Sequence, residues 1–174
     1  MNKYIKLIAY SVLAIFILSL VGCNDKEKPA PEAIYLAPES GGQFTKEELS
    51  KYPEVIKVTS SNDLKKSVTK NTAIWIDKDS INLIDIKWLQ KEAQDKIPIA
   101  LIGYNNALYS FRDTFNLFGI QGPYVDWTQQ KLEPGFSVGM ARENNNFMKG
   151  YNSTPDIKQI LSITNMLLEG KSPT

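Results

Sequence analysis

The side chains best suited to ligand binding or catalysis occur in three short polar segments, 59–62, 77–80 and 103–106. They combine carboxylates, an ammonium group, a phenol and carboxamides, which suit a polar ligand or a hard cation. Each segment follows an apolar run typical of a strand. Open parallel sheets bind ligands outside the carboxyl ends of their strands, so the three segments would form one rim. The candidate ligand-binding residues of this rim are Asp77, Lys78, Asp79, Tyr104 and Asn105.

The same residues also have a structural interpretation. Asp79 or Ser80 can cap a following helix, and Asn105 or Asn106 can do the same. Asp77 can pair with Lys78 or with a lysine of an adjacent loop. Residue types alone therefore leave both a ligand site and a set of helix caps open.

Tyr124, Asp126 and Trp127 form a second candidate segment, in which two aromatic side chains flank a carboxylate. Rings beside a polar group suit carbohydrate or peptide recognition, so Asp126 and Trp127 are candidate ligand-binding residues. We favour the alternative that Tyr124 and Trp127 cover an open edge of the sheet. A third possibility pairs Asp126 with Glu133 as the acid and base of a glycosidase.

The composition excludes several classes of chemistry. The chain has no histidine and one cysteine, Cys23, which removes Ser-His-Asp and Cys-His catalysis and histidine-bound zinc. No Gly-x-Gly-x-x-Gly or Gly-x-Ser-x-Gly motif follows a strand-like run. Arg112, one of two arginines, could clamp an anion, although a bond to a neighbouring carboxylate or carbonyl is the simpler expectation. We therefore assign no catalytic residue, no metal site and no cofactor.

The N-terminus has the pattern of a secretory signal peptide. Lys3 and Lys6 precede an apolar stretch, residues 7–21, that is too short to be typical of a membrane-spanning helix. The stretch ends in Leu20-Val21-Gly22-Cys23, which resembles the lipobox of bacterial lipoproteins. That resemblance implies cleavage after Gly22 and a diacylglyceryl (palmitate-containing) anchor on Cys23. Two acyl chains give stable membrane attachment, on the extracytoplasmic face of the cell membrane. The alternative is an uncleaved anchor helix.

These features predict a signal peptide over 1–22, a lipidated cysteine with a flexible tether over 23–33, and a single α/β domain over 34–174. The tether is charged and rich in proline, and cannot form a core. The signal peptide contains two of the 20 basic residues and none of the 19 acidic residues, so the mature chain is nearly neutral. A dedicated nucleic-acid partner is therefore not expected.

Strand and helix patterns alternate along the domain. A capping box, Thr45 with Glu48, predicts a short helix, and the final helix is expected to begin with Thr154 as its N-cap. The predicted strands are 55–59, 73–76, 99–102 and 136–140; the predicted helices are 46–51, 63–69 with Ser61 or Asn62 as its cap, 79–95 and 105–118. This order predicts a small three-layer Rossmann-like or flavodoxin-like domain with a mostly parallel sheet.

The globular part, from Thr72 to Lys171, resembles uncharacterised lipoproteins of bacilli. The segments that carry the resemblance are 74–78, 108–112, 122–127, 133–137 and 160–166. It implies a lipid-anchored location, leaning to a Gram-positive envelope, and it assigns neither an activity nor site residues. The leading hypothesis is a non-enzymatic module that binds an envelope protein or a small polar ligand at the membrane surface. The alternative is an envelope enzyme that uses the carboxylate, tyrosine and asparagine rim.

Overall fold

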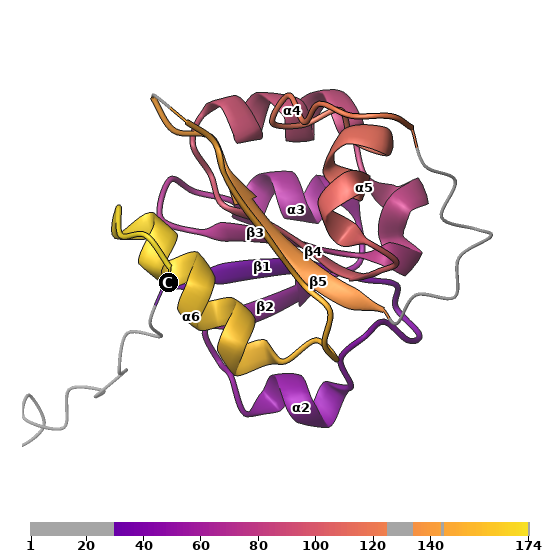
Figure 1. Cartoon of the computed structure of the whole chain (residues 1–174). Coiled ribbons are helices and arrows are strands. Elements are labelled where there is room, and N and C mark those ends of the chain that lie inside the picture. The colour runs from indigo at the N-terminus through magenta and orange to yellow at the C-terminus, as the bar shows by residue number, and fades with distance from the viewer. Residues whose placement is uncertain (1–29, 125–133, 144, 174) are drawn as a thin grey trace, which may run out of the picture. The chain divides into compact units, whose positions relative to one another are not determined.

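Six strands form one mixed sheet in the order β2-β1-β3-β4-β5-β6 (Figure 1). The computed structural model describes residues 30–124, 134–143 and 145–173. The first four strands are mutually parallel, and β5 runs antiparallel to both β4 and β6. The strands are β1 (Ala33–Leu36), β2 (Val55–Val58), β3 (Ala73–Asp77), β4 (Ile99–Tyr104), β5 (Gly135–Met140) and β6 (Phe147–Tyr151). The expected α/β domain with a mostly parallel sheet is confirmed at this level.

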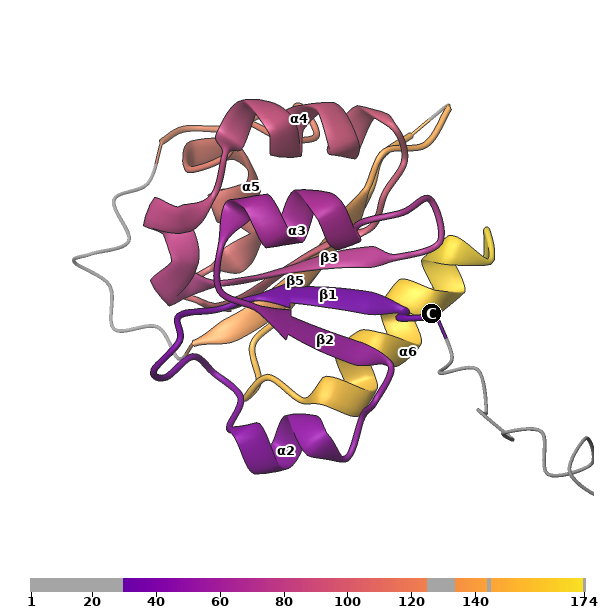
Figure 2. The same ribbon diagram turned by 180° about the vertical axis from the view of Figure 1, so that it is seen from behind.

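Helices cover both faces of the sheet (Figures 1 and 2). Alternate strand residues divide the core: Tyr35, Trp75 and Phe136 face one side, and Ile34, Ile74 and Leu101 face the other. The helical elements are α2 (Lys46–Ser50), α3 (Ser61–Ser67), η1 (Lys78–Leu83), α4 (Ile86–Gln94), α5 (Ala107–Asp113) and α6 (Ile157–Leu168). Side chains of α6 pack in the first core, and those of α3, α4 and α5 pack in the second.

Continuous apolar runs explain the central strands. β3 and β4 are buried along their whole length, as strands covered on both faces should be. β1 begins at Ala33, one residue before the expected start of the domain. β6 was not predicted: its residues are only partly buried, and the sequence Phe-Met-Lys-Gly-Tyr lacks a continuous apolar run.

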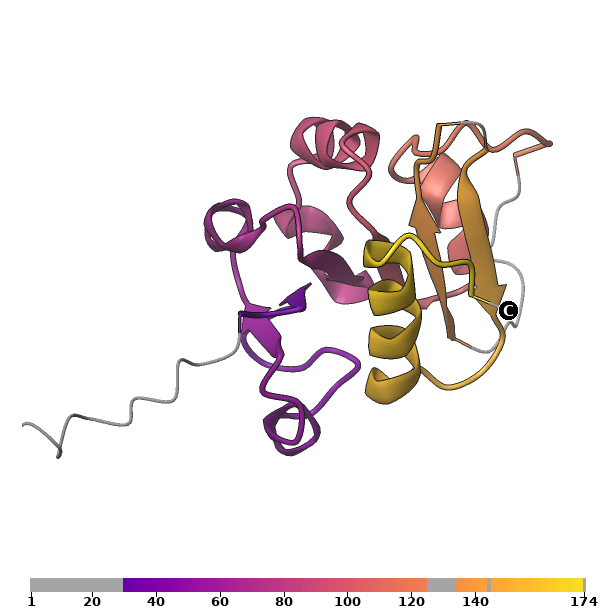
Figure 3. The ribbon, with the colours of Figure 1, turned by 90° about the vertical axis from the view of Figure 1, so that its left-hand side faces the viewer.

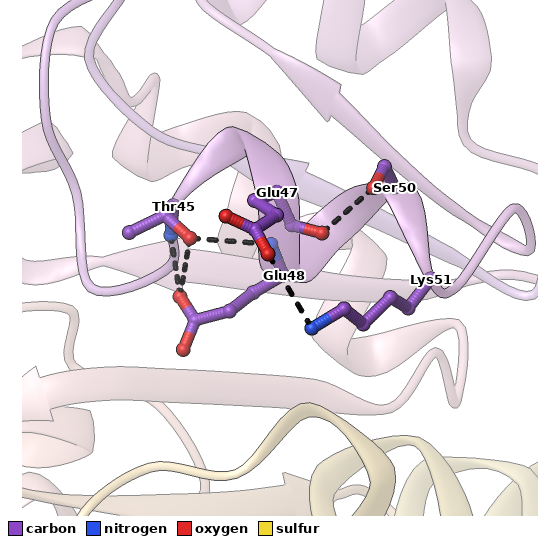
Figure 4. A network of polar contacts seen from close by, with 5 residues as sticks. All are labelled: Thr45, Glu47, Glu48, Ser50 and Lys51. Atoms are coloured by element: carbon purple, nitrogen blue, oxygen red, sulfur yellow. Dashed lines mark hydrogen bonds and ion pairs between the residues drawn. The ribbon is translucent and has the colours of Figure 1, made fainter.

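The predicted capping box of α2 is confirmed (Figure 4). The backbone N–H of Thr45 donates to Glu48 Oε2 over 2.7 Å, and the Glu48 N–H donates to Thr45 Oγ1 over 3.2 Å. The bond from the Thr45 N–H, together with one from the Thr45 hydroxyl to Glu48 Oε2 at 2.8 Å, lowers the pKa of the Glu48 carboxyl. Three other predicted caps were wrong. Ser60 caps α3 in place of Ser61 or Asn62, Asp156 caps α6 in place of Thr154, and Asp77 caps η1 in place of Asp79 or Ser80.

The single helix expected over 79–95 is two elements. Asp77 caps the 3₁₀ helix η1, Ile84 is extended, and Asp85 caps α4 by accepting the Trp88 N–H at 3.2 Å. Ile81, expected on the inner stripe, is exposed. The mid-segment carboxylate of Asp85 favours a new helix start over continuation, because it satisfies an otherwise unpaired N–H.

The helix expected over 105–118 is also shorter. α5 ends at Asp113, and Asn116 and Phe118 have φ angles of 49° and 61°. Phe118 instead packs edge-on against Phe111, with ring centroids 5.1 Å apart. Gly139 on β5 makes this possible, since a Cβ there would lie 2.4 Å from Phe118 Cε2.

Candidate functional site

Asp77 and Tyr104 lie at the carboxyl ends of two neighbouring strands, β3 and β4, as the sequence predicted. The segments that begin there carry the other candidates of the rim, Lys78, Asp79 and Asn105. The structure therefore brings these five residues into one region. The segment 59–62 follows β2, which β1 separates from β3, so it lies farther along the same edge.

The Asp77 side chain is fully buried, and both of its carboxylate oxygens accept hydrogen bonds from other residues of the domain. Its Oδ2 accepts a short hydrogen bond from the Tyr35 hydroxyl on β1 and another from the Gln43 N–H at 2.6 Å. Its Oδ1 accepts the Asp79 N–H at 3.0 Å, which starts η1. The carboxylate thus joins β1, β3, the segment after β1 and the first turn of η1.

Both tyrosines of this region are held as neutral phenols. Burial raises the pKa of Tyr35 well above its ordinary value, and the hydrogen bond and negative charge of Asp77 raise it further. Burial also raises the pKa of Tyr104, with smaller contributions from the charges of Asp77 and Asp79. The Tyr104 hydroxyl lies 3.4 Å from the Asp77 carbonyl oxygen. These phenols act as hydrogen-bond donors to groups within the domain.

The segment between β1 and α2 covers this end of the sheet. A Cβ at Gly42 would lie 3.2 Å from Asp77 Oδ2, and a Cβ at Gly103 would lie 2.4 Å from the Gln43 side chain. Both glycines have positive φ angles, 101° and 79°, which residues with side chains rarely adopt. Glycine at both positions lets the covering segment approach the strand ends closely.

The remaining candidates of the rim face outward. Asp79 and Asn105 are exposed and Lys78 is half-buried. Their side chains form no hydrogen bond with another residue of the described ranges. Asn106 is the N-cap of α5, but its side chain forms no capping hydrogen bond. Four cavities of about 400–600 Å³ in the described part of the chain are lined by other residues.

Cys23, Asp126, Trp127 and Glu133 lie outside the described residues, so the anchor and the second segment remain predictions. Next to that segment, Tyr124 is 76% exposed. Arg112 donates to the carbonyl oxygens of Gly122 and Pro123 at 2.8 and 2.7 Å and pairs with Asp113. Arg112 therefore binds carbonyls and a carboxylate, as the simpler of its two interpretations expected.

Sequence reasoning missed Tyr35 and Gln43 as partners of Asp77. They lie 42 and 34 residues away from it, and no local pattern marks them. Within residues 30–124, 134–143 and 145–173, no three acidic side chains gather as a metal site would require. None of the helices in these ranges has the length and apolar character needed to span a bilayer. No family model, curated protein or solved structure matches the chain.

Proposed function

We propose that this protein is an extracytoplasmic lipoprotein, held on the cell membrane through a diacylglyceryl group on Cys23, whose domain binds a ligand or a protein partner. The observation that carries the anchor is the order of residues at the N-terminus. Two lysines, an apolar stretch and Leu20-Val21-Gly22-Cys23 follow one another with the spacing of a lipoprotein signal peptide. The thiol of Cys23 is the only one in the chain, so the lipid has a single possible attachment point of this kind.

The strand order supports a fold of the doubly wound type for this domain. The first five strands follow the order 2-1-3-4-5 of flavodoxin-like domains, with β5 reversed and β6 added at the edge. Folds of this type carry their functional groups on loops, and the loops here are polar. We therefore classify the domain as flavodoxin-like, with helices on both sides of the sheet.

The internal use of Asp77 favours a binding module over the alternative enzyme. An enzyme of the rim would need Asp77 or Tyr104 in contact with substrate, but Asp77 is fully buried and Tyr104 is 8% exposed. Each of the two Asp77 oxygens already accepts at least one hydrogen bond. A substrate could reach this carboxylate only after the Gly42–Gln43 segment moved away.

Replacement of Cys23 by serine tests the anchor. We expect Cys23→Ser to abolish labelling with radioactive palmitate and to leave the signal peptide uncleaved by the lipoprotein-specific peptidase. The measurement is labelling of growing bacteria, followed by membrane fractionation and immunoblotting of the chain. Gly22→Ala is the matched control, because it keeps a small residue before the cysteine and should still be labelled. Labelling of Cys23→Ser would refute the assignment.

A further inference from the structure

A cavity of about 400 Å³ lies between α4, the segment that follows α5, and the turn that joins β5 to β6. Figure 3 shows that this segment runs between α4 and the hairpin of β5 and β6. The volume lies within the range of small-molecule sites, about 300–1,000 Å³. This cavity is at the opposite end of β4 from Tyr104, because Ala141 follows β5 where β5 pairs with the first residues of β4. It is therefore separate from the rim that contains Asp77.

Four carboxamides and no charged side chain line the cavity. The complete lining consists of Gln90, Ala93, Gln94, Asn116, Leu117, Phe118, Gly119, Ala141 and Asn146. Charged residues make up 22% of the chain, so a lining whose polar side chains are all carboxamides differs from the average composition. A ligand with a net charge would find no opposite charge among these residues. The lining selects for a neutral ligand with polar groups.

Two of the carboxamides bond to the backbone of the segment 115–118, which forms one wall of the cavity, and the other two are available to a ligand. The side-chain NH₂ of Gln90 donates to the Phe115 carbonyl at 3.1 Å, and that of Asn146 donates to the Phe118 carbonyl at 2.9 Å. No other described residue donates a hydrogen bond to the carbonyl oxygens of these two side chains. The exposed side chains of Gln94 and Asn116 form no hydrogen bond with another described residue, so each offers a donor and an acceptor.

The segment 116–119, which forms this wall of the cavity, has an uncommon left-handed backbone conformation at three residues. Asn116, Phe118 and Gly119 all have positive φ angles, 49°, 61° and 60°. Such a conformation costs a bulky residue like phenylalanine about 1–2 kcal/mol. At Phe118 the packing against Phe111 and Gly139 offsets that cost. Apolar residues line the cavity together with the carboxamides: Phe118 and Ala141 are half-buried, and Leu117 and Ala93 are buried behind them in the lining.

We propose that this cavity binds a neutral carbohydrate. A sugar hydroxyl can both donate and accept a hydrogen bond, as the carboxamides of Gln94 and Asn116 can, and the C–H face of a sugar ring can contact the half-buried Phe118. Free amino acids and nucleotides carry charges that this lining does not match. The inference extends the binding-module part of the proposed function and does not depend on the anchor at Cys23.

The test is isothermal titration calorimetry of the full chain, purified from whichever cell fraction contains it. If that fraction is the membrane, the detergent has no sugar headgroup. The probes are glucose, galactose, mannose, N-acetylglucosamine and maltose, with glucuronate and glucosamine as charged counterparts. We expect at least one neutral sugar to saturate the protein with a Kd at or below the millimolar range. We expect its charged counterpart to bind about tenfold more weakly or not at all. Absence of binding by every neutral sugar, or equal binding of the charged probes, would overturn the proposal.

A double variant places the binding in the cavity. Gln94→Ala with Asn116→Gly removes two carboxamides, and glycine keeps the positive φ that Asn116 requires. We expect affinity to fall about tenfold or more, because a typical hydrogen bond contributes about 1 kcal/mol. Gln159→Ala is the matched control, since Gln159 is an exposed helical glutamine that lines a different cavity. Circular dichroism melts verify folding, and unchanged affinity in a folded double variant would refute this location.

Binding and anchoring fail independently. A protein that retains palmitate on Cys23 but binds no neutral sugar would refute the carbohydrate site alone. A protein that binds sugar but carries no lipid would refute the anchor alone. The two results therefore distinguish the further inference from the proposed function.

Discussion

Removal of the Tyr35 hydroxyl tests whether the buried Asp77 carboxylate organises the fold. Tyr35→Phe keeps the ring that packs against Phe44, with centroids 5.4 Å apart. It removes the hydroxyl, which donates to Asp77 and also accepts the Gln43 N–H at 3.1 Å. Asp77 keeps the N–H groups of Gln43 and Asp79. The variant therefore removes the hydrogen bond to a buried charge without creating a large cavity, and the Gln43 N–H keeps its shorter bond to Asp77.

The expected cost follows from the burial of both partners. Tyr35 and Asp77 are fully buried, so water cannot replace the lost donor. Hydrogen bonds to charged groups contribute about 1.5–3 kcal/mol to the free energy of unfolding, and we expect Tyr35→Phe to lower it by that amount. In Tyr35→Phe/Asp77→Asn, the two changes should be non-additive, because the partners are in direct contact.

The assay is urea unfolding followed by tryptophan fluorescence at neutral pH. The tilted ring of Phe44 lies between Tyr35 and Trp75, with its centroid 6.4 Å from that of Trp75, so the indole reports on this core. Tyr124→Phe is the control, because this side chain is 76% exposed and its loss should change the free energy of unfolding by less than about 0.5 kcal/mol. A cost below about 0.5 kcal/mol for Tyr35→Phe would refute the role assigned to the bond.

Alkaline pH supplies an independent readout. The pKa of Tyr35 is raised above the value of 10.0 that applies to the unfolded chain. The stability that depends on its neutral form is fully present below pH 10 and falls as the pH rises above it. Above pH 10 the wild type should therefore lose about 1.4 kcal/mol per pH unit more than Tyr35→Phe. Parallel alkaline profiles of the two proteins would contradict this expectation.

Three further substitutions test other contacts. Thr45→Ala should lower the free energy of unfolding by about 0.5–2 kcal/mol in urea titrations, through loss of the N-cap. The same variant should make the free energy of unfolding depend less on pH below 4.5. The lowered pKa of Glu48 gives stability that is present above its ordinary pKa of 4.5 and is lost as the pH falls below it. An unchanged pH dependence in this acid range would argue against the capping box. Gly139→Ala places a Cβ 2.4 Å from Phe118 Cε2, so we expect a cost of about 1–3 kcal/mol that the second change Phe118→Leu relieves. Failure of that rescue would point to another cause. Leu64→Ala removes the one buried side chain of α3 and should cost about 2–5 kcal/mol; a smaller effect would mean that α3 is weakly docked.

Local signals predicted the parts of the fold that local physics determines. The capping box of Thr45 and Glu48 was found because both partners lie within four residues. β3 was found because a continuous apolar run is typical of a strand buried on both faces. The break at Asp85 was missed because its neighbours Ile84 and Trp88 fit a helical stripe, and only the structure shows the Trp88 N–H bonded to Asp85.

The candidate site shows the limit of sequence reasoning more clearly. The rim was placed at the correct strand ends, because β3 and β4 are neighbours in a parallel pair. The burial of Asp77 could not be predicted, because it depends on Tyr35 and Gln43 far away in the chain. The carboxamide-lined cavity was missed for the same reason: Gln90, Asn116 and Asn146 come from three elements that meet only in the folded domain.

The bond from the Gln43 N–H to the buried Asp77 carboxylate has a consequence for the motions of the domain. Gln43 lies in an irregular segment, where amide protons usually exchange with solvent quickly. Its nitrogen lies 2.6 Å from an Asp77 oxygen that water does not reach, so exchange of the proton requires the segment to lift away from the strand ends. In hydrogen-exchange experiments, the protection of this one amide reports how often the domain uncovers Asp77.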